Sequence, residues 1–235
     1  LTYGEKEQNE QIEPFVFNML ATALECFNTV DEGNLIEMLE MIIEMASYEA
    51  HPFKKYFNDI VKLVSQITNK KDYTVMNCQK IRELAFDVVV EIVEEIPGLF
   101  NKNENILKSF LNNLYMYALE TSVNDNSSSS YNEWACSSMT ATTSYSNVKT
   151  IFEDNVRFVY SVIDRLDSSL TPSYFIRVLS ELITTLINKD NDYWKYIGLL
   201  SLSQVMCYAE DITSVEKVFP FIFSMLSNVS RCSCK

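Results

Sequence analysis

The sequence is poor in the residues that interrupt helices. Its 235 residues include only four glycines and five prolines, and no Asn-Gly or Asp-Gly dipeptide occurs. Such dipeptides are the strongest short-range signal for β-hairpins, and glycine and proline mark the turns between short strands. Their scarcity therefore predicts long helices rather than a protein of many short strands.

The residues that most catalytic and cofactor sites need are also scarce. His51 is the only histidine, and it precedes Pro52 at an expected turn. Without a second histidine there is no clear metal triad or Cys/His dyad. The four glycines are isolated, so the sequence has no phosphate loop or dinucleotide fingerprint. We therefore expect no enzyme and no cofactor; a helical enzyme stays an alternative that only an unexpected metal or cofactor would support.

Positive charge is limited, with 19 lysines and arginines against 32 carboxylates and a net charge of −13. This balance disfavours nucleic acid, whose phosphates need basic contacts. It favours basic partners, although solubility alone is an equally simple explanation. No apolar run reaches the roughly 18 residues that span a bilayer, and the polar start does not resemble a signal peptide. We expect no membrane insertion.

The six cysteines do not form the dense pattern of a secreted disulfide framework. We interpret them as reduced thiols in a cytoplasmic or nuclear protein. Cys232 and Cys234 are a weak metal signal, because no second ligand pair lies nearby. The chain starts without methionine and stops without a clear end signal, so we expect a fragment of a longer protein.

Apolar residues recur at steps of three and four along most of the chain, the spacing of one helix face. Pro97 and Gly98 are expected to end one of these segments. Together the stripes predict nine helices, at residues 12–29, 35–46, 53–67, 81–96, 106–118, 148–166, 174–186, 194–205 and 215–226.

The sequence also repeats itself. The run PFVFNML at 14–20 returns as PFIFSML at 220–226, an offset of 206 residues or about five units of 41. Expected first-helix starts near 31, 75, 147 and 191 differ by 44, 72 and 44 residues. A period of roughly 40 to 47 residues with two helices per unit is typical of HEAT repeats. The predicted fold is an all-α, right-handed α-solenoid of antiparallel helix pairs over residues 1–235.

The 72-residue step contains the one long irregular segment, at about 122–146. It is rich in serine and asparagine and lacks apolar spacing, so it is expected to be a flexible loop. Loops this long inside a repeat array are often functional.

In a repeat of this type the second helices line the inner wall, where side chains off the apolar stripe face a possible partner. By helical position, carboxylates and amides on expected second helices are candidate binding residues. The alternative is that they are simply solvated. The candidates are Asp59, Asn112, Asn113, Glu120 and Glu181.

Three features between Leu114 and Ala209 resemble the importin-beta family of nuclear transport receptors, closest to the importin-beta-3 type. A helix is followed by a long loop with a Glu133-Trp134 element. Glu153 and Arg157 then open a helix. The run DYWKYIGLLSLS at 192–203 is similar to a Trp-Lys/Arg-Tyr motif followed by Gly-Leu and Leu-Ser.

The resemblance implies a central section of a nuclear import receptor that moves between cytoplasm and nucleus through the nuclear pore. Its implied partners are basic cargo proteins with nuclear localisation signals, the GTPase Ran and nucleoporins with Phe-Gly repeats. Trp194 and Tyr196 are expected to pack between repeats. The alternative is a HEAT-repeat scaffold subunit of a complex with no role in transport.

Overall fold

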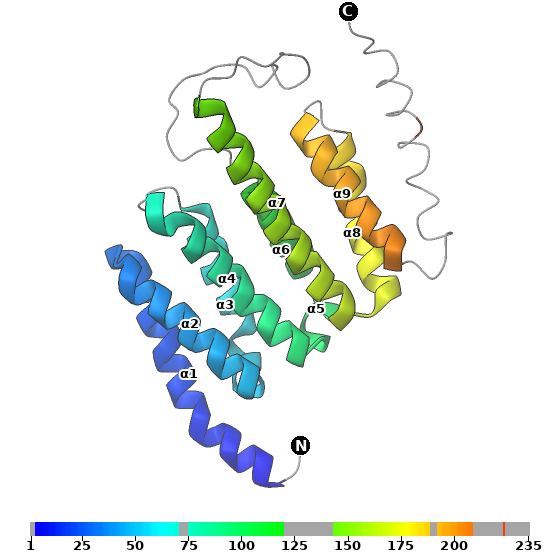
Figure 1. The fold of residues 1–235 in the computed structure, drawn as a ribbon. Helices are drawn as coiled ribbons and strands as arrows, with labels where there is room; N and C mark the ends of the chain where they lie inside the picture. The colour runs from blue at the N-terminus through cyan, green and yellow to red at the C-terminus, as the bar shows by residue number, and fades with distance from the viewer. Residues whose placement is uncertain (1–2, 71–74, 120–142, 189–191, 209–222, 224–235) are drawn as a thin grey trace, which may run out of the picture. The chain divides into compact units, whose positions relative to one another are not determined.

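The computed structural model describes residues 3–70, 75–119, 143–188, 192–208 and 223. Every regular element within these ranges is a helix, and none of the described residues forms a strand (Figure 1). The prediction of an all-helical chain is thereby confirmed for the described part.

Connections of at most five residues join consecutive helices, except that residues 119–142 separate two of them. In chain order they are α1 (Tyr3–Thr29), α2 (Glu32–Tyr48), the 3-10 helix η1 (His51–Tyr56), α3 (Phe57–Asn69), α4 (Val75–Glu95), α5 (Gly98–Asn101), α6 (Glu104–Ala118), α7 (Thr143–Ser169), α8 (Pro172–Ile187) and α9 (Asp192–Tyr208).

Eight of the nine predicted helices correspond to described elements, and the ninth, at 215–226, falls almost wholly outside the described residues. Several boundaries differ from expectation. Helix α1 begins at Tyr3 rather than at residue 12, and α4 at Val75 rather than at residue 81. The segment predicted as 53–67 is a 3-10 turn followed by α3, and residues 98–101 form the extra short helix α5. Helix α7 begins at Thr143, so residues 143–146 are helical rather than part of the expected loop. Residues 122–142 of that loop lie outside the described residues.

The chain divides into two compact units. Unit 1 comprises residues 1–114 and 161–174, and unit 2 comprises residues 115–160 and 175–235. Helices α6 and α7 therefore each contribute residues to both units. The two units are described separately below.

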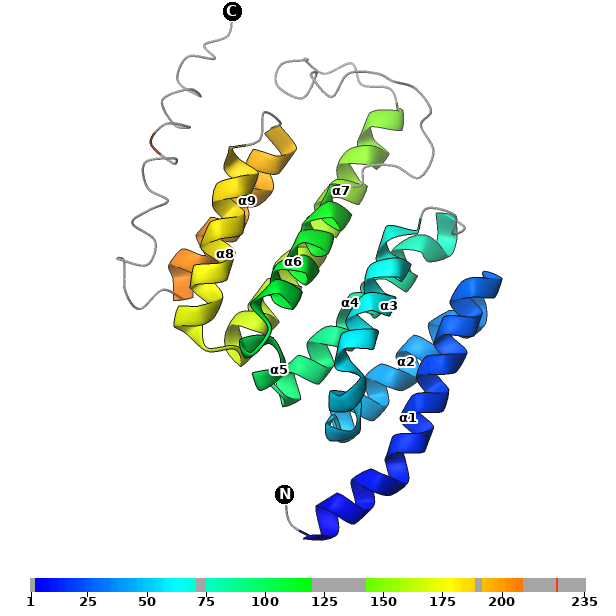
Figure 2. The same ribbon diagram turned by 180° about the vertical axis from the view of Figure 1, so that it is seen from behind.

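Unit 1 is built from two layers of helices. Helices α2 and α4 lie side by side in one layer, in front in Figure 1. Helices α1 and α3 lie in the other layer, in front in Figure 2, with α3 packed against α4. This is the first-helix and second-helix arrangement expected from the repeat.

Aromatic rings fill the core of unit 1. Phe86 on α4 meets Phe110 on α6 edge to face, with ring centroids 5.6 Å apart. Phe100 on α5 lies 5.6 Å from Phe110 and 5.4 Å from Phe57 on α3. All four side chains are at most 2% exposed. Because these rings come from four helices, α5 is held in the core although it is only one turn long.

Unit 2 joins its helices through buried polar groups. The hydroxyl of Tyr115 on α6 donates to Ser201 Oγ on α9 at 2.8 Å. The amide of Gln204 donates to the carbonyl oxygen of Tyr160 on α7 at 2.9 Å. The amide of Asn155 donates to the carbonyl oxygen of Tyr117 at 3.2 Å. Buried polar groups need such partners, so these bonds fix which residues face one another.

Helices α8 and α9 approach closely in unit 2 at Gly198. A Cβ placed on this glycine would lie 2.8 Å from Ile187 Cγ1 and 3.4 Å from Leu186 Cβ. Only a residue without a side chain fits there without a shift of its neighbours.

Candidate protein-binding surface

Three of the predicted binding residues lie on second helices of unit 1. Asp59 on α3 is exposed and pairs with Lys62 at 3.0 Å. On α6, Asn112 is exposed and Asn113 is half-buried. The Asn113 amide donates to Ser65 Oγ on α3 at 2.9 Å. Asn113 therefore links the two second helices, while Asn112 and Asp59 remain open to solvent.

The other candidates are distributed elsewhere. Glu181 lies on α8 in unit 2, exposed and 3.9 Å from Arg177 one turn earlier. Glu120, Glu133 and Trp134 lie outside the described residues. The structure thus brings together only the α3 and α6 members of the predicted set.

Trp194 and Tyr196, the residues expected to pack between repeats, differ in burial. Both lie in the first turns of α9. Trp194 is half-buried, whereas Tyr196 is 41% exposed. Two residues after Tyr196, Gly198 lies so near α8 that an added Cβ would meet Ile187 and Leu186.

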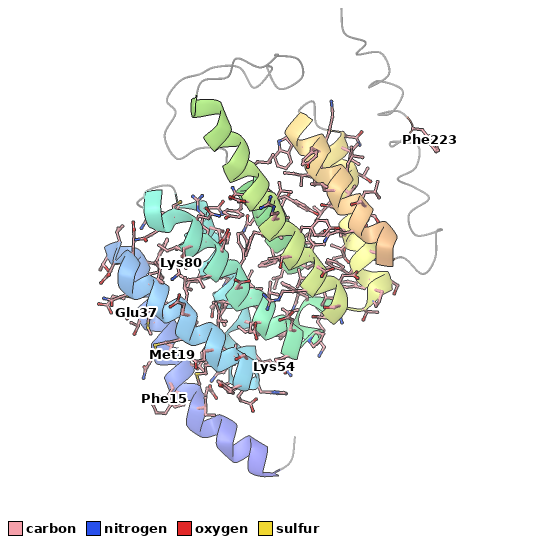
Figure 3. The ribbon with its side chains drawn as sticks, in the orientation of Figure 1. Phe15, Met19, Glu37, Lys54, Lys80 and Phe223 are labelled. Atoms are coloured by element: carbon pink, nitrogen blue, oxygen red, sulfur yellow. The ribbon has the colours of Figure 1, made fainter. Side chains whose placement is uncertain are left out.

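The charge of unit 1 differs between its two layers. On the second-helix side, η1, α3 and residues 104–114 of α6 carry four lysines and two carboxylates. Helix α1 in the same layer carries five carboxylates and one lysine. Figure 3 labels one of the lysines, Lys54 on η1. The six charged residues of η1, α3 and this part of α6 are Lys54, Lys55, Asp59, Lys62, Glu104 and Lys108.

Helices α2 and α4 form the more acidic layer of unit 1. They contain nine acidic residues and two basic ones. Lys80 on α4 pairs with Glu40 on α2 at 2.8 Å (Figure 3). The acidic residues are Glu32, Glu37, Glu40, Glu44, Glu83, Asp87, Glu91, Glu94 and Glu95.

Arg165 on α7 binds three of these carboxylates. Its Nη1 lies 3.0 Å from Asp87 Oδ1, and its Nη2 lies 2.8 Å from Glu91 Oε2. Nε and Nη2 bind both carboxylate oxygens of Glu94, at 2.9 and 2.5 Å. The three acids are spaced by four and three residues and so lie on one stripe of α4. We call Asp87, Glu91 and Glu94 the α4 carboxylate row.

Sequence reasoning missed this cluster because it interpreted the glutamates near the end of α4 as a solvated face. The spacing of these carboxylates on one stripe of α4 was a usable signal. Their partner could not be identified from the sequence, because Arg165 follows Glu94 by 71 residues.

The cluster shifts the proton affinities of its members. Burial is the main cause that raises the pKa of Asp87 to about 6. The positive charge of Arg165 lowers this pKa, and the negative charges of Glu83, Glu91 and Glu94 raise it. The bond to Glu94 raises the pKa of Arg165, so this guanidinium keeps its charge. Burial, and then the nearby charge of Asp164, raise the pKa of Asp167 two residues after Arg165. The three carboxylates of the row therefore share the single positive charge of Arg165.

The described residues offer no evident reaction centre. No three His, Cys, Asp or Glu side chains among them are grouped to hold a metal ion. His51 is exposed in η1, with Nδ1 3.3 Å from Glu49. None of the described helices combines the length and apolar character of a membrane span.

Comparison with known proteins shows the fold. No family model matches the sequence, and no curated protein matches it. Among solved structures, the karyopherin Kap121p bound to RanGTP matches over 94% of this chain with a TM-score of 0.69 and 16% identity. Kap121p bound to the extreme C-terminus of the phosphatase Cdc14p matches over 92%, and Kap121p bound to the SUMO protease Ulp1p over 94%, with the same score and identity.

This chain spans one fifth of the length of each of those chains. The predicted solenoid of HEAT-type helix pairs is confirmed by these matches.

Proposed function

We propose that this chain is a central section of an importin-beta-type nuclear transport receptor, closest to the importin-beta-3 type. The observation that carries the proposal is the match to karyopherin structures over nearly the whole chain. The motif Trp194-Lys195-Tyr196, followed by Gly198-Leu199, supports it independently. On this proposal the protein binds partners rather than catalysing a reaction, and it works in both cytoplasm and nucleus.

Cargo would bind along the second helices. The amide of Asn112 can both donate to and accept from the backbone of an extended peptide, while Asp59 offers a carboxylate to a lysine. Asn113 already bonds Ser65, so it would hold α3 and α6 in place beneath the peptide. Glu120, and Glu181 on α8 of unit 2, are proposed as further cargo contacts in their own right.

The distribution of charge in unit 1 limits how much electrostatic attraction can contribute to cargo affinity. The second-helix side of unit 1, α1 included, carries five lysines and seven carboxylates, so long-range attraction of a basic cargo there is weak. Amide contacts would contribute most of the affinity in unit 1. Salt would then weaken binding only modestly, since screening acts on charges and not on neutral hydrogen bonds.

The other two partners follow from the same proposal. One similar structure is of Kap121p bound to RanGTP, and we propose that Ran controls cargo release from the whole receptor. Phe-Gly nucleoporins would dock between neighbouring first helices, of which α2 and α4 are the pair in unit 1. Nucleic acid and membranes are not proposed partners.

A peptide titration tests the cargo surface. A labelled lysine-rich localisation peptide is titrated into the 235-residue chain at low and high ionic strength, with an acidic peptide as the control. We expect the basic peptide to bind more tightly. Replacing Asn112 and Asn113 together with alanine should weaken it about fivefold or more, at roughly 0.5–1.5 kcal/mol per hydrogen bond. The matched control, Glu37→Gln on α2, should leave binding unchanged.

Two results would count against the proposal. Equal binding of both peptides, or none of the basic one at low salt, would remove cargo recognition from this segment. Failure to bind Phe-Gly peptides as well would favour the alternative, a HEAT scaffold of a complex outside transport.

A further inference from the structure

The α4 carboxylate row has more negative charge than its one cation can balance. Arg165 makes four hydrogen bonds to three carboxylates, whose side chains are only 22–30% exposed. Glu83 lies one turn before Asp87 on the same stripe of α4. Asp164 and Asp167 flank Arg165 on α7. One guanidinium therefore serves three carboxylates, with Glu83 adding negative charge next to Asp87 and Asp164 next to Asp167.

Partly buried like charges disfavour one another's ionisation, so one member of such a row holds a proton more tightly than usual. Geometry indicates which one. Glu94 receives two hydrogen bonds from Arg165 and Glu91 receives one through the shared Nη2. Asp87 receives one and is the member nearest along the helix to Glu83. The raised pKa of Asp87, about 6, agrees with this assignment.

We propose that Arg165 and the α4 carboxylate row form a proton-responsive latch, in which uptake of one proton by Asp87 strengthens the hold of α7 residues 161–169 on α4. A neutral Asp87 no longer repels Glu91 and Glu94. These two retain three of the four bonds to the guanidinium. The protonated carboxyl also gains an O–H donor that it can direct at a neighbouring carboxylate.

The latch responds to pH in the direction opposite to most ion pairs. A folded-state pKa above the ordinary value of 3.8 means that the folded chain binds the proton more tightly than the unfolded chain does. Stability then rises as the pH falls through 6, and the gain is complete near pH 4. Glu13 shows the usual behaviour, because its bond to Lys55 lowers its pKa and is lost in acid.

A neutral replacement of Asp87 tests the proton site. Asp87→Asn keeps the shape of the side chain but cannot ionise. The melting temperature of the full 235-residue chain is measured at pH 5, 6 and 7 and constant ionic strength. We expect Asp87→Asn to melt above the parent at pH 7, with the difference clearly smaller at pH 5, because the folded parent is then largely protonated at Asp87. Comparing the two proteins at each pH cancels the titration of groups that do not interact with residue 87.

A matched control removes an exposed carboxylate from another helix. Asp59→Asn on α3 should differ from the parent by the same amount at all three pH values. If Asp87→Asn also differs by a constant amount, or melts below the parent at pH 7, the proton site is rejected.

Hydrogen exchange tests whether the proton acts on α7. After correction for intrinsic exchange rates, amides of residues 161–169 should be better protected at pH 5.5 than at pH 7 in the parent. In Asp87→Asn the protection should be high at both values. Constant protection in the parent would reject the latch even if Asp87 titrates near 6. Arg165→Lys, which keeps the charge but not the planar fork, should retain the pH effect with lower protection throughout.

Discussion

The two units hold their helices together by different means. In unit 1, four phenylalanine rings from α3, α4, α5 and α6 meet with centroids 5.4–5.6 Å apart. In unit 2, hydrogen bonds from Tyr115, Asn155 and Gln204 cross between helices inside the protein. Ring packing depends on volume and tolerates small shifts, whereas a buried hydrogen bond requires a particular distance and direction. We therefore expect unit 1 to be most sensitive to loss of side-chain volume. Unit 2 should be sensitive to loss of a polar partner and to added side-chain volume.

The largest expected effect comes from emptying the aromatic core. Phe110 is 2% exposed and meets the rings of both Phe86 and Phe100. Phe110→Ala should lower the free energy of unfolding by about 3–5 kcal/mol. Urea denaturation followed by circular dichroism measures the change. Phe110→Leu, which keeps most of the volume, should cost less than half as much; an equal loss would show that ring contacts rather than volume dominate.

Adding volume to unit 2 should have the next largest effect. Gly198→Ala places a methyl group 2.8 Å from Ile187 Cγ1 and 3.4 Å from Leu186 Cβ. Overpacking of this kind costs about 1–3 kcal/mol. A double variant with Ile187→Ala should recover part of the loss, measured by the same denaturation. If the two losses simply add, the tight contact between α8 and α9 is not the cause.

Removing one partner of a buried polar pair should have a smaller effect. Tyr115→Phe leaves the Ser201 hydroxyl, 2% exposed as a residue, without its donor. The expected loss is about 1–2 kcal/mol. Tyr115→Phe combined with Ser201→Ala should be less destabilised than the sum of the single variants, since no polar group is then left alone. Thermal denaturation of all four proteins supplies this double-mutant cycle.

The smallest effect is expected at a turn outside both cores. Val30 joins α1 to α2 with a φ of 60°, the left-handed region that branched side chains rarely adopt, and its side chain is 46% exposed. Val30→Asn should raise the free energy of unfolding by about 1 kcal/mol, because asparagine tolerates this conformation. Val30→Ile, which keeps the branched side chain, should leave stability nearly unchanged. A stabilisation by both would point to a cause other than backbone strain.

Periodicity predicted most of the fold. In α8, for example, Phe175, Val178, Leu179, Ile183 and Leu186 of the predicted stripe are at most 2% exposed. Local signals were weaker at the breaks. Pro97 ends α4 as expected, but the following Gly98 did not prevent a further turn, because Leu99 and Phe100 are drawn into the core. Tertiary burial outweighed the local preference of glycine.

The candidate surface was predicted less well than the fold. Helical position placed Asp59, Asn112 and Asn113 on second helices, and the structure has them there. The distribution of charge was not predictable from the total of −13, because a total does not say which layer holds the carboxylates. The pairing of Arg165 with α4 depends on how distant helices stack, which no local pattern encodes.

The split of unit 1 between two stretches of sequence has a consequence for its synthesis on the ribosome. Residues 1–114 emerge first, yet the unit is completed by residues 161–174, which supply Arg165 and the Tyr174 hydroxyl that donates to the carbonyl oxygen of Phe100. At about 5–20 residues per second, the emerging chain waits several seconds for these groups. During that interval the α4 carboxylates lack their guanidinium and repel one another. A nascent chain stalled when residue 119 but not residue 161 has left the exit tunnel should therefore expose α4 to proteases or chaperones. A chain stalled far enough past residue 174 to release that residue from the tunnel should protect α4.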